Sequence, residues 1–218
     1  PSGEITNLPY LKHVAGKGKP VILSTGMSTL GDVEEAVNVL RAAGTTQLSL
    51  LHCVTEYPAP YAEVNLRAMH TLKTAFGLPV GYSDHTPGIE IAIAAVAMGA
   101  TIIEKHFTMD RSLPGPDHAA SLEPAELKQM VAAIRNVEKA LGTGIKAPAP
   151  CELPNISVAR KSVVASHSLN AGHRLSAGDL AIKRPGNGLA PKLLPALIGR
   201  SLRSNLTKDE VITWDHLG

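Results

Sequence analysis

Two histidines follow short apolar runs at similar places in the chain, and they are the side chains with the clearest chemical potential. His85 ends the segment Gly81-Tyr-Ser-Asp-His85, and His106 ends Glu104-Lys-His106. Imidazole nitrogens are good ligands for divalent metal ions, and two of them with room for water and a substrate oxygen would suit a catalytic site. Histidine pairs also occur as buried hydrogen-bonding groups, so spacing alone leaves both interpretations open.

Hydroxyl groups end two further apolar runs. Ser24 ends the run that begins at Pro20, and Thr55 and Tyr57 follow the run 47–53. A serine hydroxyl and backbone N–H groups at the start of a helix could hold a phosphate group. Ordinary helix capping explains the same residue types, so this interpretation also stays open.

Glu104 is predicted to lie on an interior strand, where an unpaired carboxylate costs several kcal/mol. A metal ion, a lysine or a sugar hydroxyl would offset that cost. Lys105 is an unsuitable partner, because adjacent strand residues point to opposite faces. The loop 109–118 that follows is long for a strand-to-helix connection, and its Asp117 and His118 are either capping residues or substrate ligands.

The elements that must position these residues alternate between strand and helix. We predict strands at 20–25, 47–53, 79–82 and 100–104, and helices at 30–43, 64–76, 87–100 and 123–141. Ser121 is the predicted N-cap of the last helix. Four strand–helix units imply an α/β fold with a parallel sheet, either doubly wound or half of a (β/α)8 barrel. All four strand ends then meet at one edge of the sheet.

The character of the chain changes after residue 141. We predict a barrel-like domain at 1–141, a Gly/Pro-rich linker at 142–155 that is extended and semi-rigid, and a small module at 156–218. Turn signals and short β-branched runs make that module mainly β, with one short helix near 193–198.

Composition excludes several classes of protein. The net charge is +2 and aromatic residues make up 3% of 218 residues, which argues against nucleic-acid binding. No apolar stretch reaches the ~20 residues of a membrane span, and the first residues lack a signal-peptide pattern. Cys53 and Cys151 are too few for a disulfide framework, which fits a reducing compartment. We therefore predict a cytoplasmic protein with no membrane or nucleic-acid partner.

Six segments, in this order and spacing, resemble the sialic acid synthase (N-acetylneuraminate synthase) family, which condenses phosphoenolpyruvate with an amino sugar such as N-acetylmannosamine. They are residues 22–27, 51–58, 82–86, 104–108, 114–117 and 183–188. The resemblance implies the C-terminal half of a (β/α)8 TIM barrel followed by a small antifreeze-like (SAF) β-clip domain. It also implies a domain-swapped homodimer.

The resemblance further implies a divalent metal, Mn²⁺ or Mg²⁺, held by His85 and His106. With these two histidines, Glu4 and Glu104 match the family's catalytic positions. The substrate-binding positions are matched by Ser2, Ser24, Thr55, Tyr57, Ser83, Asp117 and Arg184.

Within that set, the serines match contacts to phosphoenolpyruvate, and Tyr57 and Asp117 lie with the two glutamates around the sugar. Thr55 stands near the phosphate, where some members have Asn, so a hydroxyl replaces an amide. Arg184 would reach the N-acyl group from the partner subunit.

Three alternatives remain. The amino sugar could be a 2,4-diacetamido-trideoxy mannose, which would make the enzyme an N,N'-diacetyllegionaminate synthase, or the chain could be a non-catalytic carbohydrate-binding or ice-binding-like fragment. A two-histidine metal hydrolase is disfavoured, because Glu104 and His106 lack the HExxH spacing. Since four strands cannot close an eight-stranded barrel, we also expect the 218-residue chain to be inactive by itself.

Overall fold

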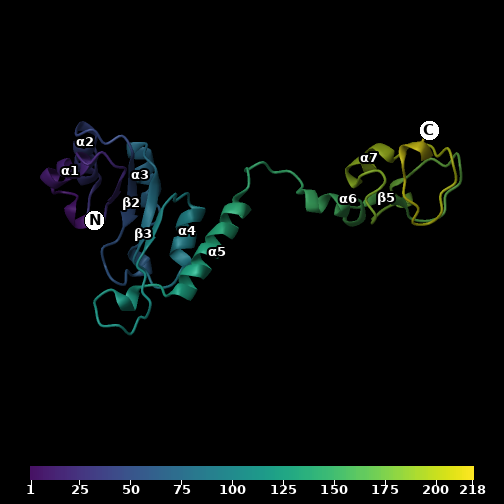
Figure 1. Ribbon diagram of the computed structural model, residues 1–218. Coiled ribbons are helices and arrows are strands. Elements are labelled where there is room, and N and C mark those ends of the chain that lie inside the picture. The colour runs from purple at the N-terminus through teal and green to yellow at the C-terminus, as the bar shows by residue number, and fades with distance from the viewer. The chain divides into compact units, whose positions relative to one another are not determined.

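The computed structural model describes residues 1–218 as two compact units, 1–144 and 145–218, which are treated separately here (Figure 1). None of the helices is both long and apolar enough to span a lipid bilayer. Short 3-10 turns accompany the main elements in both units. They lie at Ser2–Glu4, Tyr61–Glu63, His118–Ala120, Pro150–Glu152, Ala177–Asp179, Pro191–Leu193 and Trp214–His216.

The first unit is built on a parallel sheet with strand order β1-β2-β3-β4. Its strands are β1 (Val21–Ser24), β2 (Leu48–Cys53), β3 (Val80–Asp84) and β4 (Ile103–Lys105). Each strand is followed by a helix, namely α2 (Leu30–Ala42), α3 (Ala68–Phe76), α4 (Glu90–Ala97) and α5 (Pro124–Leu141). The prediction of four consecutive strand–helix units in the geometry of a half-barrel is confirmed.

The core lies between the sheet and its helices. Val33, Val37 and Leu40 form the buried stripe of α2, and they belong to the same apolar cluster as Leu50 of β2 and Leu72 of α3. Each large aliphatic side chain buried in this way contributes about 1.5–3 kcal/mol to folding. The core therefore holds the strand ends in fixed positions.

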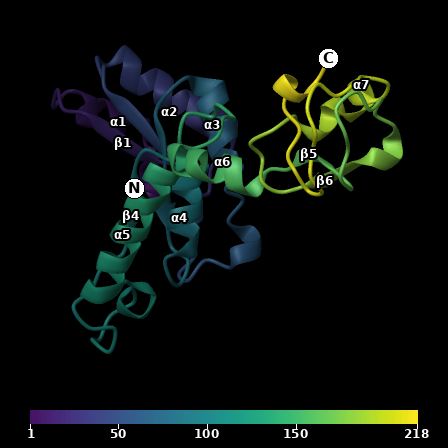
Figure 2. The same cartoon turned by 90° about the vertical axis from the view of Figure 1, so that its right-hand side faces the viewer.

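The helix α4 has apolar residues on all of its sides, and it packs against two different apolar clusters. Ala92 belongs to the apolar cluster with Leu122 and Met130 of α5, whereas Ala95 belongs to the cluster beneath the sheet. Figure 2 shows α4 and α5 lying beside each other. A helix without a polar face must be buried on both sides, and this one is.

An additional helix, α1 (Leu8–Ala15), precedes β1 and was not predicted. Asn7 is its N-cap, with a side-chain oxygen that accepts from Tyr10 N at 3.3 Å, and a proline occupies the first turn. Leu11 and Ala15 are buried on one face. The cap residue, the early proline and this spacing are ordinary helix-start signals, so the sequence did contain the information.

Three predicted helix starts were wrong. α3 begins at Ala68 rather than 64, after Asn65 with φ 49°, and α4 begins at Glu90 rather than 87, after Gly88 with φ 72°. Left-handed residues of this kind interrupt a helix. The N-cap of α5 is Glu123, which forms a capping box with Glu126, whereas the Ser121 hydroxyl donates to Asp117 O at 2.7 Å.

The second unit contains α6 (Leu153–Ala159), an antiparallel pair β5 (Ser162–Ala165) and β6 (Leu180–Lys183), and α7 (Leu194–Leu197). Its core is formed by Val163, Leu175, Leu197, Leu206 and Ile212. The expected linker at 142–155 contains the start of α6, because proline is tolerated in the first turn of a helix. The short helix expected near residues 193–198 is present as α7.

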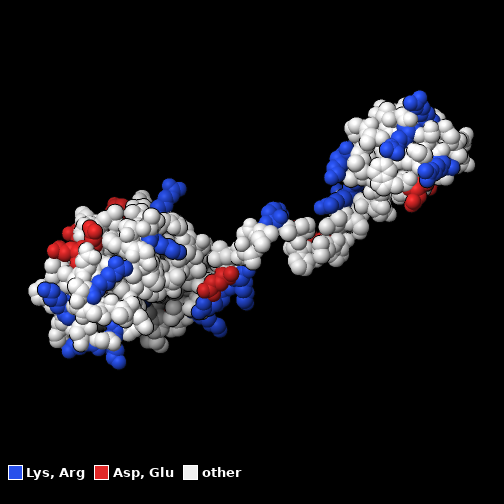
Figure 3. Space-filling view, turned by 90° about the horizontal axis from the view of Figure 1, so that it is seen from above, with Lys and Arg blue, Asp and Glu red and all other residues white.

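The two units carry opposite net charges. Ten of the 21 Lys and Arg residues lie in 145–218, against five Asp and Glu, whereas residues 1–144 have fourteen acidic and eleven basic residues. Basic side chains are spread over the visible face of the second unit (Figure 3).

Candidate active site

A cavity of about 260 Å³ lies where the four strands end. Because the strands are parallel, their carboxyl ends meet at one edge of the sheet, and side chains from different units come together there. The cavity is lined by Pro1, Ser2, Gly3, Ser24, Cys53, Thr55, Tyr57, Ser83, His85, Glu104 and His106. Eight of the residues singled out from the sequence are therefore gathered in one place.

The two imidazoles lie close together at this cavity in an edge-to-face arrangement. Their ring centroids are 5.3 Å apart and the rings are nearly perpendicular. His85 is buried, and its Nδ1 lies 2.7 Å from Val54 O. A carbonyl oxygen can only accept, so Nδ1 carries a proton, and in the neutral imidazole Nε2 keeps its lone pair. Fixing the tautomer in this way is the usual arrangement for a metal-binding histidine.

His106 is more exposed, with 31% of its side chain open to solvent. Its Nδ1 lies 3.8 Å from Asp117 Oδ2, which brings Asp117 near the cavity although it does not line it. The Tyr57 ring lies 4.1 Å from the His85 ring and 5.2 Å from the His106 ring, measured between centroids. Burial and the nearby Cys53, Asp117 and Glu104 raise the pKa of the Tyr57 phenol, so it remains a hydrogen-bond donor.

Hydroxyl groups from residue 2 and from the end of β1 also meet at this cavity. Ser2 Oγ lies 2.9 Å from Ser24 Oγ and accepts from Gly26 N at 2.9 Å. Thr55 Oγ1 is buried and has no hydrogen-bond partner. A buried hydroxyl without a partner is rare, and here it lies at a cavity that could hold one.

Glu104 is placed differently from the expectation. It is exposed rather than interior, and its Oε1 accepts from Ser83 Oγ at 2.7 Å. β4 is the last strand of this sheet, so no neighbouring strand covers its far side. As expected, Lys105 points away from Glu104, and it pairs with Asp84 instead.

Cys53 also lines the cavity, which the sequence did not reveal because the residue reads as an ordinary buried thiol. Burial alone raises the pKa of this thiol. Interactions with His85, Ser24 and Ser83 outweigh burial and lower the pKa below its usual value. The thiol thus belongs to the polar lining rather than to the apolar core.

Three of the predicted site residues do not line the cavity: Asp117, which lies near it, and Glu4 and Arg184. The Glu4 carboxylate accepts from Asn7 Nδ2 at 2.7 Å, beside the start of α1. Arg184 belongs to the second unit, where its Nε donates to Ala159 O at 3.1 Å and the rest of the side chain is exposed.

The donor set suits a metal ion that keeps open coordination positions. No group of three or more His, Cys, Asp or Glu side chains is arranged to hold a metal ion. Two imidazoles, of which His85 is held in the metal-binding tautomer, can supply two ligands, with the remaining positions left to water and substrate oxygens. These residues therefore fit a catalytic rather than a structural metal.

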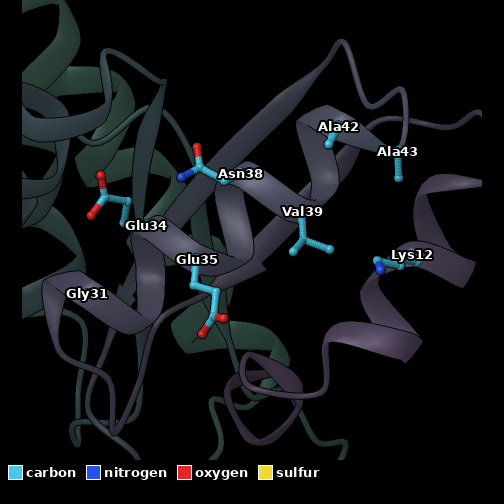
Figure 4. Close-up of a pocket in the computed structure, with 8 residues that line it drawn as sticks. All are labelled: Lys12, Gly31, Glu34, Glu35, Asn38, Val39, Ala42 and Ala43. Carbon is cyan, nitrogen blue, oxygen red and sulfur yellow. The ribbon is translucent and has the colours of Figure 1, made fainter.

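A larger cavity of about 930 Å³ lies elsewhere in the first unit, between α1 and α2 (Figure 4). α1 contributes Lys12, and α2 contributes Glu34, Glu35, Asn38 and Val39. It has no histidine, cysteine or hydroxyl side chain in its lining, so it offers no nucleophile or metal ligand of the kind found at the strand ends.

Comparison with known proteins agrees with this geometry. Residues 1–146 match the NeuB family, and residues 160–218 match the SAF domain. The chain belongs to the NeuB family. The expectation of a barrel half joined to an antifreeze-like domain is thereby confirmed.

Several known proteins are similar to this chain. It is 54% identical to N,N'-diacetyllegionaminic acid synthase of Campylobacter jejuni, over 97% of this chain and 64% of the relative. It is 38% identical to N-acetylneuraminate-9-phosphate synthase of Drosophila melanogaster, over 97% and 63%. The crystal structure of the spore coat polysaccharide biosynthesis protein SpsE of Bacillus subtilis matches with a TM-score of 0.61 and 36% identity, covering 100% of this chain and 66% of SpsE. The chain thus spans just under two thirds of the length of these curated relatives.

Proposed function

We propose that this chain carries the metal-binding and sugar-binding part of a nonulosonate synthase, a transferase that condenses phosphoenolpyruvate with an N-acyl amino sugar and releases phosphate. The observation that carries the proposal is the pair of imidazoles, 5.3 Å apart, at a cavity that also contains Glu104 and a wall of hydroxyl groups. The family resemblance supplies the identity of the two substrates.

Each side chain has a role that its contacts allow. A divalent ion bound by His85 and His106 would polarise the aldehyde of the open-chain sugar. The Glu104 carboxylate accepts from Ser83 and has a second oxygen free to accept from a sugar hydroxyl. The Tyr57 phenol, whose pKa is raised and whose ring lies against His85, is available to donate a hydrogen bond to the substrate.

The hydroxyl wall of Ser2, Ser24 and Thr55 would contact the phosphate of phosphoenolpyruvate. The lining contains no lysine or arginine side chain, so these hydroxyls orient the phosphate but do not balance its charge. C3 of phosphoenolpyruvate would attack the sugar aldehyde, water would add at C2 and phosphate would leave, so this scheme needs no protein nucleophile. The residues accelerate the reaction by positioning the two substrates.

For the amino sugar, we propose a 2,4-diacetamido-trideoxy mannose rather than N-acetylmannosamine. The 54% identity to an N,N'-diacetyllegionaminic acid synthase supports this choice. We further propose a domain-swapped homodimer in which the exposed Arg184 of one subunit contacts the N-acyl group at the other subunit's cavity.

The test measures phosphate release from phosphoenolpyruvate in the presence of Mn²⁺ and each of the two sugars. It uses the 218-residue chain, which we expect to be inactive by itself, and a chimera in which this chain replaces the aligned segment of the Campylobacter jejuni relative. A second chimera, built in the same way on the Drosophila melanogaster relative, separates the sugar preference of this chain from that of its host.

We expect Mn²⁺-dependent phosphate release from the chimera and its loss on substituting His85→Ala or His106→Ala. The matched control is His70→Ala, an exposed histidine on α3 that should leave the rate unchanged. Absence of phosphate release with every sugar, while calorimetry still detects sugar binding, would favour the non-catalytic carbohydrate-binding alternative.

A further inference from the structure

A buried ion pair lies directly behind the two histidines. Asp84 ends β3 and Lys105 ends β4, and the two residues are opposite each other in the register of these strands. Lys105 Nζ lies 2.8 Å from Asp84 Oδ2, and the side chains are 3% and 0% exposed. Because strand residues alternate, this pair faces away from the cavity that Ser83 and Glu104 line.

Both charged groups of the pair make further hydrogen bonds to the residues around them. Asp84 Oδ1 accepts from Thr86 N at 2.9 Å and from Thr86 Oγ1 at 2.8 Å. Lys105 Nζ donates a second hydrogen bond to Thr86 O. Two neighbouring strands and the turn between β3 and α4 are therefore tied together at one point. His85 lies within this set of hydrogen bonds, between Asp84 and Thr86 in the sequence, and His106 is the next residue after Lys105.

Stability alone is a weak reason for such a pair. Removing two charges from water is costly, and well-packed apolar residues of similar volume often serve the fold as well or better. What a buried ion pair provides beyond stability is a single defined geometry, because any shift of either strand leaves a charge unpaired. Asp84 and Lys105 each lie one residue before an imidazole. The geometry that the ion pair defines is therefore the distance between the two imidazoles.

We propose that Asp84 and Lys105 are positioning residues, which set the distance and orientation of His85 and His106 for binding one metal ion. This inference rests on the metal site of the proposed function. It goes beyond that function in assigning the spacing of the two ligands to a pair of residues outside the cavity. A pair with only a structural role would affect folding and leave the affinity of the folded protein for metal unchanged.

The experiment measures Mn²⁺ binding to the 218-residue chain by electron paramagnetic resonance of free Mn²⁺, so it needs no catalytic activity. Two variants are compared with the unmodified chain. Asp84→Asn keeps the shape, but its amide N–H₂ group faces the Lys105 ammonium, because the amide oxygen is needed by Thr86. The double variant Asp84→Leu with Lys105→Met replaces the pair by apolar side chains, and it removes the risk that one unpaired buried charge prevents folding.

Circular dichroism identifies a temperature at which each variant is folded, and binding is measured there. We expect the dissociation constant for Mn²⁺ to rise by about 10- to 100-fold in both variants, as for other residues that orient metal ligands. The matched control is Arg135→Met, which breaks the exposed ion pair between Arg135 and Glu138 on α5 and should leave Mn²⁺ binding unchanged.

A folded double variant with the original Mn²⁺ affinity would overturn the inference while leaving the proposed function intact. Failure of the unmodified chain to bind Mn²⁺, or equal binding after His85→Ala, would instead overturn the metal site of the proposed function, and the inference with it.

Discussion

The hydroxyl groups around the cavity differ in how well they are satisfied. Ser2, Ser24 and Ser83 all have partners within the protein, whereas Thr55 Oγ1 has none. Burying a hydroxyl without a partner destabilises a folded protein. Such a group persists when a ligand completes its hydrogen bonding, and on the proposed function that ligand is the phosphate of phosphoenolpyruvate.

We therefore expect Thr55→Val in the chimera to raise the KM for phosphoenolpyruvate by about 10-fold, the size of one hydrogen bond to a charged group. The thermal unfolding midpoint should stay the same or rise, because the hydroxyl makes no bond within the protein. Steady-state kinetics and calorimetry measure the two effects.

Thr45→Val is the matched control. Thr45 Oγ1 is also buried without a partner, but it lies in the connection between α2 and β2, among residues that do not line the cavity. It should leave the KM unchanged. An equal rise in KM for both variants would show that the effect is not specific to the cavity.

Some of this site could be predicted from residue types alone. His85 and His106 directly follow neighbouring parallel strands, so their proximity follows from the alternation of strands and helices. The contact between Ser83 and Glu104 could not be predicted, because it depends on the register of β3 against β4. The position of Cys53 at the cavity could not be predicted either, because the sequence of an apolar strand does not tell which face of the sheet its cysteine occupies.

At the scale of elements, the closeness of β3 and β4 depends on a glycine. A Cβ atom at Gly81 would overlap the carbonyl oxygen of Ile102 and lie 2.6 Å from a methyl group of Leu51. The first of these neighbours is backbone and cannot rotate away. The strands that end at the two histidines thus meet at a distance that only glycine allows.

We expect Gly81→Ala to destabilise the first unit by about 1–3 kcal/mol, as overpacking of a buried site does. Gly31→Ala is the control, because its Cβ would meet nothing closer than 3.7 Å in the first turn of α2, and alanine should be neutral or stabilising there. Urea unfolding followed by circular dichroism compares them. Equal stability of Gly81→Ala and the unmodified chain would contradict the close approach.

The elements also show where local sequence signals fail. The apolar spacing of α2 and the terminating glycine at position 77 gave correct predictions, because burial and local propensity agree there. The starts of α3 and α4 were predicted too early, since the left-handed Asn65 and Gly88 follow from loop packing rather than from apolar spacing. α1 was not predicted, although Asn7 and the proline in its first turn are ordinary helix-start signals.

In the second unit, Asp179 organises the turn before β6. Its Oδ2 accepts from Ser176 N and Ser176 Oγ, both at 2.7 Å, and lies 3.0 Å from His173 Nε2, while Oδ1 lies 3.2 Å from His167 Nε2. Hydrogen bonds from His173 and Ser176 hold the pKa of this carboxyl well below its usual value. The ionised carboxylate therefore stabilises the folded unit.

The direction of this pKa shift determines how the stability of the folded unit changes with pH. The stabilisation is present above the unfolded pKa, about 4, and is lost as the pH falls through the lowered folded value. We expect Asp179→Asn to destabilise the second unit by about 2 kcal/mol at pH 7, and the difference from the unmodified chain to shrink below pH ~4. Thermal unfolding across pH measures it, with the exposed Asp215→Asn as control. A difference independent of pH would contradict the role of the charge.

At the scale of the whole molecule, the proposed dimer makes each active site a joint product of two chains. Mixing two inactive chimeras tests this directly, one with Arg184→Ala and one with His85→Ala and His106→Ala. In a mixed dimer, one site combines an intact pair of histidines with an intact Arg184 from the other chain. Random pairing then restores about a quarter of the original activity. No recovery after mixing and re-association would show that Arg184 acts within its own chain.

The opposite net charges of the two units, fourteen acidic against eleven basic residues in one and ten basic against five acidic in the other, mean that each molecule carries an acidic unit and a basic unit. The overall charge of only +2 does not reveal this difference between the units. Such a small net charge also gives little long-range repulsion between molecules. When salt is scarce the basic unit of one molecule attracts the acidic unit of the next, and at physiological ionic strength that attraction fades beyond roughly 8 Å. We therefore expect the protein to self-associate in buffer of low ionic strength and to associate less as salt is added, independently of the chemistry at its strand ends.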